Sequence, residues 1–300
     1  MNKTYKTILI LVTLLALLFS YLFNSRYIID CILDYSLLFI TKLFPVSFLL
    51  FIFSSLLLDY GLIKYIEKIL KINSTNIYLF VVSMLSGFPS GCKYTKDLLD
   101  KGYIDVDIAN KYIMFSHFPN PLFILGSVNI LLDDLYLSSI ILLSIIISNF
   151  IIMLFVSKNN NYKYSYTISN NFSKSLSLAI SNSFNIIICI YGVSLFFYLI
   201  SCIITRIFVI NGYLYIVICG IFDLTKGIFS TSIISNNVIR ACFILLFSVF
   251  GSLSIHMQVS SILIDSKIKY SNFLKGRIIG LIISFCLFFI FLLIKKDLYF

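Results

Sequence analysis

Two stretches of this chain combine serine, glycine and lysine within apolar surroundings, and they hold most of the residues that could bind a ligand. The first stretch runs from Ser86 to Lys93, reads SGFPSGCK, and is followed by a Pro119-Asn120-Pro121 break. Glycine and proline at this density predict backbone that leaves the helical conformation. A helix that starts at such a break presents unpaired N–H groups and the positive end of its dipole, which suit an anion.

The second stretch lies in the C-terminal half of the chain and has a similar character. The segment 213–219 is short and apolar, and it runs into the sequence GIFDLTKG at Gly220–Gly227. A longer apolar run, 233–264, is interrupted by GSLSIHMQ at Gly251–Gln258. We therefore expect two hairpins and two broken helices, one of each in either half.

Composition places these breaks in a membrane protein. Hydrophobic residues make up 60% of the 300 residues and charged residues only 12%, against about 25% charged in soluble domains. Uncharged runs such as Ile8–Phe23, Leu135–Val156 and Ile278–Ile294 approach the ~17–25 residues that a spanning helix needs. Non-helical backbone at membrane depth survives only inside protein or beside a water-filled cavity. The two stretches are therefore candidate parts of a transport pathway.

Charged residues at the breaks admit two interpretations. Lys93 follows the first hairpin turn and Lys226 lies in the second. A lysine near the midplane is functional by default, but both side chains could instead reach water at a membrane surface. Asp223 could pair with Lys226 or bind a coupling cation. His117 and His256 each adjoin a helix break, where they act either as satisfied interior residues or as proton carriers.

The sequence argues against several other classes of protein. It contains no nucleophile elbow, phosphate-binding loop, zinc-protease motif or dinucleotide turn, so we expect neither an enzyme nor a cofactor. The seven cysteines show no metal-ligand spacing and resemble small apolar residues. The net charge of +10 is spread over short connectors, which favours membrane orientation over nucleic-acid binding.

The order of segments predicts an all-helical, multi-pass protein built from two inverted repeats with re-entrant hairpins. We assign residues 1–29 to an N-terminal transmembrane helix and 30–157 to the first repeat. Residues 158–174, rich in Asn, Ser and Tyr, form a cytoplasmic linker, and 175–300 form the second repeat. Each repeat has a long span, a short hairpin, a broken helix and a closing span. Residues 61–73 read as an amphipathic helix on the membrane surface.

Charge in the connectors gives an orientation for seven expected crossings. The connectors 64–71, 158–174 and 267–277 are basic and, with the N-terminus, belong in the cytoplasm. Residues 30–34, a connector containing Asp30 and Asp34, and the Asp133-Asp134 pair belong outside. Lys295 and Lys296 disagree with this assignment, and the early connectors carry more weight.

These motifs resemble a known family. SGFPSGCKYTKDLLDKG, SHFPNPLFILGSV, GIFDLTKG and GSLSIHMQ occur in the order found in YlbJ-type sporulation integral membrane proteins, also called stage V sporulation proteins. They belong to the nucleoside-transporter Gate superfamily, and the resemblance covers about residues 30–290. The resemblance implies a nucleoside-transporter-like fold. Together with the breaks, it marks these substrate-binding residues: Ser86, Gly87, Pro89, Ser90, Gly91, Lys93, Asn120, Pro121, Asp223, Thr225, Gly227, His256 and Gln258.

The resemblance further implies a transporter in the outer forespore membrane that moves dipicolinate, a small aromatic dianion, from mother cell towards forespore. A proton or sodium coupling ion and a homo-oligomer are compatible with it. Two departures put the ligand set of the second hairpin in doubt: Asp223 replaces the usual Glu, and Lys226 stands at a small or polar position. Two alternatives stay open, namely a carrier of nucleosides or other neutral solutes, and a membrane scaffold for spore-envelope assembly.

Overall fold

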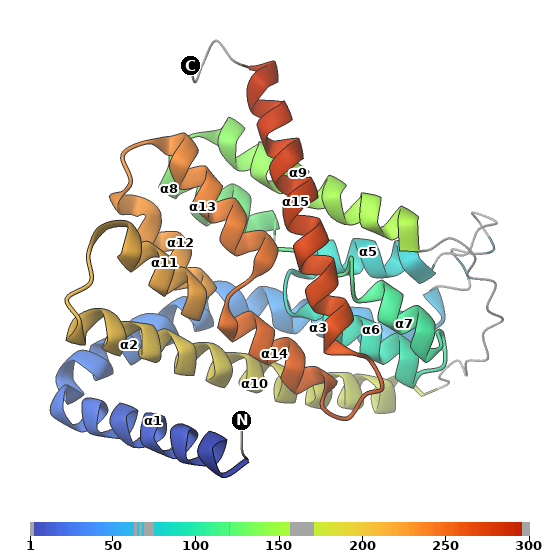
Figure 1. Ribbon diagram of the computed structural model, residues 1–300. Coiled ribbons are helices and arrows are strands. Elements are labelled where there is room, and N and C mark those ends of the chain that lie inside the picture. Colours follow the sequence, from blue (N-terminus) through green and yellow to red (C-terminus); the bar gives the residue numbers. More distant parts are fainter. Residues whose placement is uncertain are drawn as a thin grey trace.

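The computed structural model describes residues 3–62, 65, 68, 75–119, 121–156 and 171–295, and all of its regular elements in these ranges are helices (Figure 1). The first half contains α1 (Lys3–Phe23), α2 (Ser25–Leu38), a π-helical turn η1 (Phe39–Leu43), α3 (Phe44–Asp59), α5 (Thr75–Ser86), α6 (Ser90–Asp100), α7 (Val106–Tyr112), a π-helical turn η2 (Phe123–Val128), α8 (Asn129–Leu132) and α9 (Leu135–Val156). The second half contains α10 (Phe172–Ile207), α11 (Gly212–Phe222), α12 (Leu224–Ser230), a 3-10 turn η3 (Thr231–Ile233), α13 (Asn237–Phe250), α14 (Leu253–Leu263) and α15 (Tyr270–Ile294).

Several of these helices are long and apolar enough to cross a membrane. Among the described residues they are α9, α10, α15 and the run Asn237–Leu263, and a fifth candidate is the pair Leu11–Phe23 and Ser25–Thr41, which is bent by 100°. The chain therefore has the character of a multi-pass membrane protein. The seven expected crossings exceed this number because the apolar helices Ser47–Asp59 and Phe123–Leu132 are shorter than a span.

Two boundaries differ from the sequence-based expectation. Residues 30–34, expected as a polar connector, lie within α2, which follows α1 directly after a bend at Asn24. The last helix begins at Tyr270 rather than at Ile278, so Lys275 and Arg277 belong to α15. Most of the expected surface helix at 61–73 and most of the 158–174 linker lie outside the described residues.

The expected hairpins are present as short helix pairs. Helices α5 and α6 are joined by a turn in which Gly87 has a φ of +77°, a conformation that glycine adopts without steric cost. Helices α11 and α12 are separated only by Asp223, whose backbone is extended. The longer broken helices follow each pair: α7 ends at Tyr112 and helix resumes near Pro121, while α13 and α14 are separated at Gly251-Ser252.

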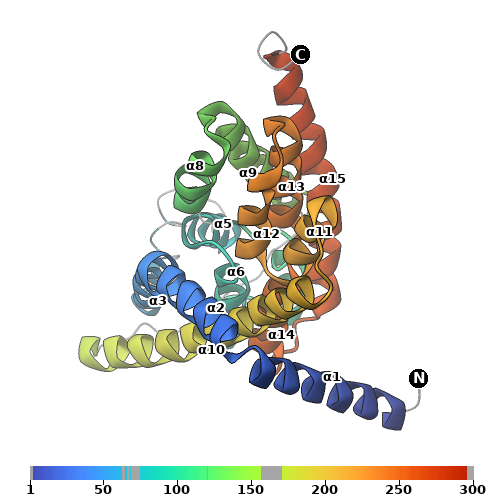
Figure 2. The ribbon, with the colours of Figure 1, turned by 90° about the vertical axis from the view of Figure 1, so that its left-hand side faces the viewer.

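The two halves pack against each other through related pairs of elements. Closing helices α9 and α15 lie along each other, and α3 packs on α10. Helix α9 also contacts α13, and α15 contacts α7, so each closing helix touches the broken helix of the other half. Figure 2 shows α1 at the edge of this body, where it packs against α2 and α10 and leaves most of its apolar side chains exposed.

Glycine permits direct backbone contact at the first break. A Cβ atom on Gly91 of α6 would lie 1.5 Å from the Ser116 carbonyl oxygen, and one on Gly276 of α15 would lie 2.2 Å from the Met114 carbonyl oxygen. Because backbone atoms cannot rotate out of the way, α6 and α15 can approach residues 114–116 this closely only with glycine at both positions. The first break is thus packed from two sides.

We expect Gly91→Ala to destabilise the protein by at least about 3 kcal/mol, because the added methyl group overlaps a backbone oxygen in a packed interior. Thermal unfolding of the purified protein in detergent measures this effect. The matched control is Gly192→Ala in α10, where a Cβ meets nothing within 4 Å and where alanine favours the helix. Equal melting temperatures for the two variants would contradict the close contact.

Candidate functional site

A cavity of about 390 Å³ lies where the hairpins and broken helices of the two halves meet. Its wall combines apolar and aromatic side chains with hydroxyl groups, one carboxylate and one amide. Such a mixture, mostly apolar with a few directed polar groups, is typical of a site for a small molecule. The lining residues are Tyr35, Thr41, Leu43, Ser47, Ser86, Phe88, Leu122, Phe123, Gly126, Ser127, Ile130, Ile190, Ser194, Asp223, Leu224, Thr225, Ser254, Ile255 and Gln258.

Four of the expected binding residues contribute to this wall: Ser86, Asp223, Thr225 and Gln258. They come from the end of α5, from the α11–α12 break, from α12 and from α14, so the fold gathers residues from both halves. Asn120 lies outside the described residues. The other expected residues are near the breaks but are not among the residues that line the cavity: Gly87, Pro89, Ser90, Gly91, Lys93, Pro121, Gly227 and His256.

Asp223 supplies the only carboxylate in the described wall of the cavity, and it also caps α12. Its Oδ1 accepts the backbone N–H of Lys226 at 2.9 Å, and its Oδ2 accepts the Ser254 hydroxyl at 3.3 Å. Only 2% of the residue is exposed. Because an aspartate cap satisfies a terminal N–H group and opposes the helix dipole, the start of α12 is already occupied by a negative group. The second hairpin therefore does not offer the open anion site that the sequence suggested.

Gln258 of α14 contributes the amide group of the cavity wall. Its Nε2 donates to the Ser194 hydroxyl at 2.5 Å, which fixes the amide, while its buried Oε1 has no partner among the described residues. A buried polar atom without a partner is costly, and Gln258 is the one cavity residue of the described structure that has such an atom. Asp223 and Gln258 together favour a solute that carries hydrogen-bond donors.

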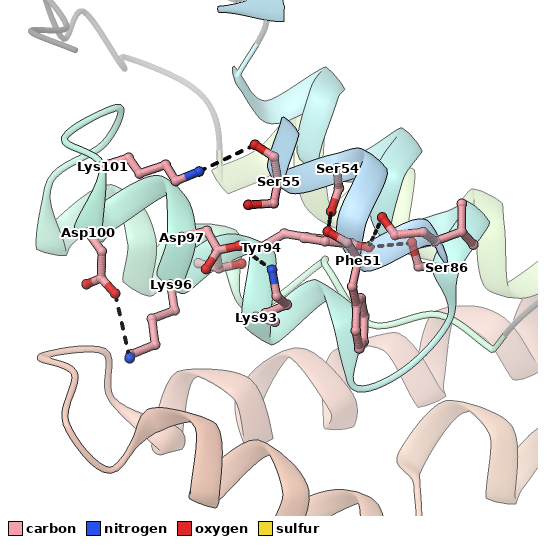
Figure 3. A network of polar contacts seen from close by, with 12 residues as sticks. Phe51, Ser54, Ser55, Ser86, Lys93, Tyr94, Lys96, Asp97, Asp100 and Lys101 are labelled. Carbon is pink, nitrogen blue, oxygen red and sulfur yellow. Dashed lines mark hydrogen bonds and ion pairs between the residues drawn. The ribbon is translucent and has the colours of Figure 1, made fainter. Parts of the chain in front are cut away.

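Lys93 is held within its own helix rather than directed at the cavity. Its Nζ lies 2.5 Å from Asp97 Oδ2, and the lysine is 3% exposed (Figure 3). The ammonium group also lies 5.6 Å from the centre of the Phe51 ring and 5.4 Å from that of Tyr94, close enough for cation–π attraction. These contacts compensate the charge of Lys93 on the side of α6 that faces α3.

Lys226 is likewise engaged away from the cavity. Its Nζ donates to Cys202 Sγ of α10 at 2.9 Å and lies 5.2 Å from the centre of the Tyr198 ring. The cavity wall thus contains no lysine or arginine among the described residues. Lys93, which the sequence predicted as a binding residue, and Lys226, whose role the sequence left open, therefore both have partners within the protein.

The two histidines meet at a phenylalanine behind the cavity. His117 and His256 both contact the Phe273 ring edge-on, with ring centres 5.2 and 5.4 Å away. His256 has partners for both ring nitrogens, the Tyr270 hydroxyl at 2.6 Å and the Phe250 carbonyl at 3.1 Å. His117 is stacked on Phe88, and its buried Nε2 has no partner among the described residues. Their similar placement matches the similar positions of the two breaks.

Sequence reasoning missed three residues around the breaks. Tyr35 and Ser194 line the cavity from α2 and α10, but in the sequence they are ordinary members of apolar runs. Arg277 was grouped with Lys267, Lys269 and Lys275 as a cytoplasmic charge, yet it is fully buried in α15. The spacing of Arg277 after Gly276, at the start of a long apolar run, was the available signal. Within the described residues, no three His, Cys, Asp or Glu side chains are grouped so as to hold a metal ion.

Comparisons with known proteins give no relatives to guide the assignment. No protein-family model, curated protein or solved structure matches this chain. The function must therefore be inferred from the cavity and its surroundings.

The Lys93–Asp97 pair can be tested with a double-mutant cycle. We expect Lys93→Met to lower stability by about 1–3 kcal/mol, between the effects measured for exposed and fully buried pairs, because it leaves Asp97 without its cation. Lys93→Met combined with Asp97→Asn should recover much of that loss in a thermal-unfolding measurement. The Lys96→Met and Asp100→Asn pair is the control, since its N–O distance is 3.6 Å and it is more exposed. Additive effects at Lys93 and Asp97 would show that the pair is not coupled.

Proposed function

We propose that this protein is a membrane transporter whose solute site is the cavity between the two halves. Support comes from the position of the cavity, which is lined by a hairpin end and a broken helix from each half. Transporters commonly bind their solutes at discontinuous helices where two repeats meet. A chain that only recruited other proteins would have no use for a cavity whose wall contains a buried carboxylate and an unsatisfied amide oxygen.

The two halves are proposed to be inverted repeats, residues 30–157 and 175–300. In both halves a helix precedes a hairpin, a broken helix and a closing helix: the 16-residue α3, then α5–α6, α7–α8 and α9 in one, and the 36-residue α10, then α11–α12, α13–α14 and α15 in the other. The reciprocal contacts of α9 with α13 and α15 with α7 also support a two-fold relation. Inverted repeats allow one half to move relative to the other around a fixed site.

The absence of a cation from the described cavity wall, together with the Asp223 carboxylate, carries our inference about the solute. A dianion there would face a negative charge in a medium of low dielectric constant, which is strongly unfavourable. A neutral solute with N–H or O–H donors would instead satisfy Asp223 and the Oε1 of Gln258. The aromatic side chains of Phe88, Phe123 and Tyr35 also line the cavity, and they can pack against an aromatic ring of the solute. A nucleoside-like solute combines these features.

Dipicolinate transport is the second candidate, and it rests on the resemblance to the YlbJ-type family. That resemblance would place the protein in the outer forespore membrane during sporulation. Dipicolinate would need a compensating cation at the cavity, and the two lysines beside the hairpin turns, Lys93 and Lys226, would have to leave Asp97 and Cys202 to supply it. The contacts of the two lysines therefore favour the neutral solute.

Uptake into proteoliposomes tests both candidates with one pair of variants. We expect uridine to accumulate faster than dipicolinate, and Asp223→Asn to reduce uridine uptake by more than about tenfold, the effect of losing one hydrogen bond to a charged group. Asparagine still caps a helix, so the fold should persist. The control is Asp105→Asn, because Asp105 caps α7 in the same way through Ile108 N–H at 2.7 Å but is not a cavity residue.

Dipicolinate uptake that exceeds uridine uptake, and that rises in Asp223→Asn, would instead favour the dianion. Uptake of neither solute by protein that unfolds cooperatively would count against both assignments.

Membrane topology provides an independent test of the repeat arrangement. Single cysteines at Lys174→Cys and Asp133→Cys, both exposed positions, are introduced into a variant in which the native cysteines are replaced by serine or alanine. An impermeant maleimide applied to whole cells should label position 133 and leave position 174 unlabelled until the cells are opened. Labelling of both positions from the same side would rule out the proposed inversion.

A further inference from the structure

Arg277 is the largest side chain buried below 2% exposure in the described structure, and its own exposure is 0%. Buried charges in proteins are normally compensated by an opposite charge or by a full set of hydrogen bonds. No described carboxylate lies within ion-pair distance of Arg277. The compensation must come from neutral groups.

Four oxygen atoms from three elements accept hydrogen bonds from the two terminal nitrogens of this guanidinium group, while its Nε has no partner among the described residues. Nη1 donates to the carbonyls of His117 and Val249 at 3.3 and 3.4 Å. Nη2 donates to the Met114 carbonyl at 2.8 Å and to Asn149 Oδ1 at 3.2 Å. Asn149 also donates its Nδ2 to the His117 carbonyl at 3.0 Å, so the oxygen cluster is itself held together.

The carbonyls in this cluster come from both breaks. Met114 and His117 follow the end of α7, and Val249 lies in the last turn of α13. Carbonyls at the C-terminal ends of helices carry partial negative charge. When such ends are broken open at membrane depth, they form the usual coordination sites for the Na⁺ of coupled transporters. Here a guanidinium group fills the equivalent arrangement.

We propose that the oxygen atoms of Met114, His117, Asn149 and Val249 form a monovalent-cation site that Arg277 occupies as a covalently tethered cation. Hard cations are bound by carbonyl and amide oxygens, which are the ligands present here. The site contains no carboxylate among the described residues, which favours a single positive charge over a divalent ion. The permanent charge of arginine keeps the site filled. If the chain is a transporter as proposed above, movement of its solute does not require Na⁺ at this position.

The backbone around the site agrees with a built arrangement rather than an accidental contact. Gly276, the residue before Arg277, allows α15 to approach Met114 so closely that a Cβ would lie 2.6 Å from the Met114 Cα. The Ser148 hydroxyl, one residue before Asn149, donates to the Gly280 carbonyl at 3.1 Å and links α9 to α15. These contacts hold Arg277 and Asn149 at the same depth as the carbonyls.

The test replaces the tethered cation by a free one and measures thermal unfolding of the purified protein in detergent, with no need for transport. Arg277→Ala removes the side chain beyond Cβ, and ethylguanidinium restores the missing atoms. We expect about 10–50 mM ethylguanidinium or Na⁺ to raise the melting temperature of the Arg277→Ala protein by roughly 3 °C or more. These concentrations are many times a dissociation constant of about 1 mM. The bulky cation N-methyl-D-glucamine at equal ionic strength should not.

Two matched proteins make the result specific. The wild type should show no such difference between Na⁺ and N-methyl-D-glucamine, because its site is filled. Arg240→Ala should show none either, although Arg240 also donates to backbone carbonyls, those of Leu131 and Ile234. An Arg277→Ala protein that responds equally to all three cations would overturn the proposal, as would a wild type that is stabilised by Na⁺.

Arg277→Lys covers the case in which the alanine variant does not fold. The lysine ammonium group keeps the positive charge but has fewer N–H donors than arginine. The Arg277→Lys variant should therefore unfold at a higher temperature than Arg277→Met, which has no charge. Equal melting temperatures for the lysine and methionine variants would overturn the proposal. Because every readout here is stability, failure of this test would leave the proposed solute transport to be judged by its own uptake assay.

Discussion

The rest of this structure depends on one constraint: backbone groups that leave the helix inside the apolar protein must find hydrogen-bond partners there. Residues 113–119, between α7 and Pro121, leave the helix and are almost all buried, so their backbone groups need partners within the protein. Arg277 and Asn149 donate to them from α15 and α9, while Gly91 and Gly276 let two helices approach their backbone. Hydrogen bonds and close backbone contacts to this one short segment therefore help to position the closing helices α9 and α15.

The three cations beside the breaks, Lys93, Lys226 and Arg277, are each compensated by a nearby group of the protein. Lys93 forms an ion pair with Asp97, Lys226 donates a hydrogen bond to Cys202, and Arg277 donates to helix-end carbonyls. Asp223 differs because its partners are a backbone N–H and a hydroxyl, and its side chain borders the cavity. A carboxylate left without a cation partner in a low-dielectric wall attracts hydrogen-bond donors. This difference distinguishes the proposed solute site from the surrounding structural polar contacts.

The helical hairpins and breaks could be read from residue types, since glycine and proline act on the backbone locally. Leu135–Val156 was predicted with its observed ends, and the break at Gly251 occurs where its glycine indicates. The turn predicted at 86–91 is shorter, because α6 already begins at Ser90. Local signals failed at Asn24, where a 100° bend separates two helices without proline or glycine. At this bend α2 packs on α10, a tertiary contact that no local sequence pattern indicates.

The sequence by itself determined that the chain is helical, apolar enough for a membrane, and broken at four places. It also named four cavity residues, Ser86, Asp223, Thr225 and Gln258, because polar groups at helix breaks must face something other than lipid. Only the tertiary structure decided which charges are free. Lys93 pairs with Asp97 one helical turn away, a spacing that the sequence does contain, whereas Arg277 meets carbonyls more than 100 residues away, at distances that sequence spacing does not contain. The physical reason is that the energy of a charge is set by its nearest partners in space.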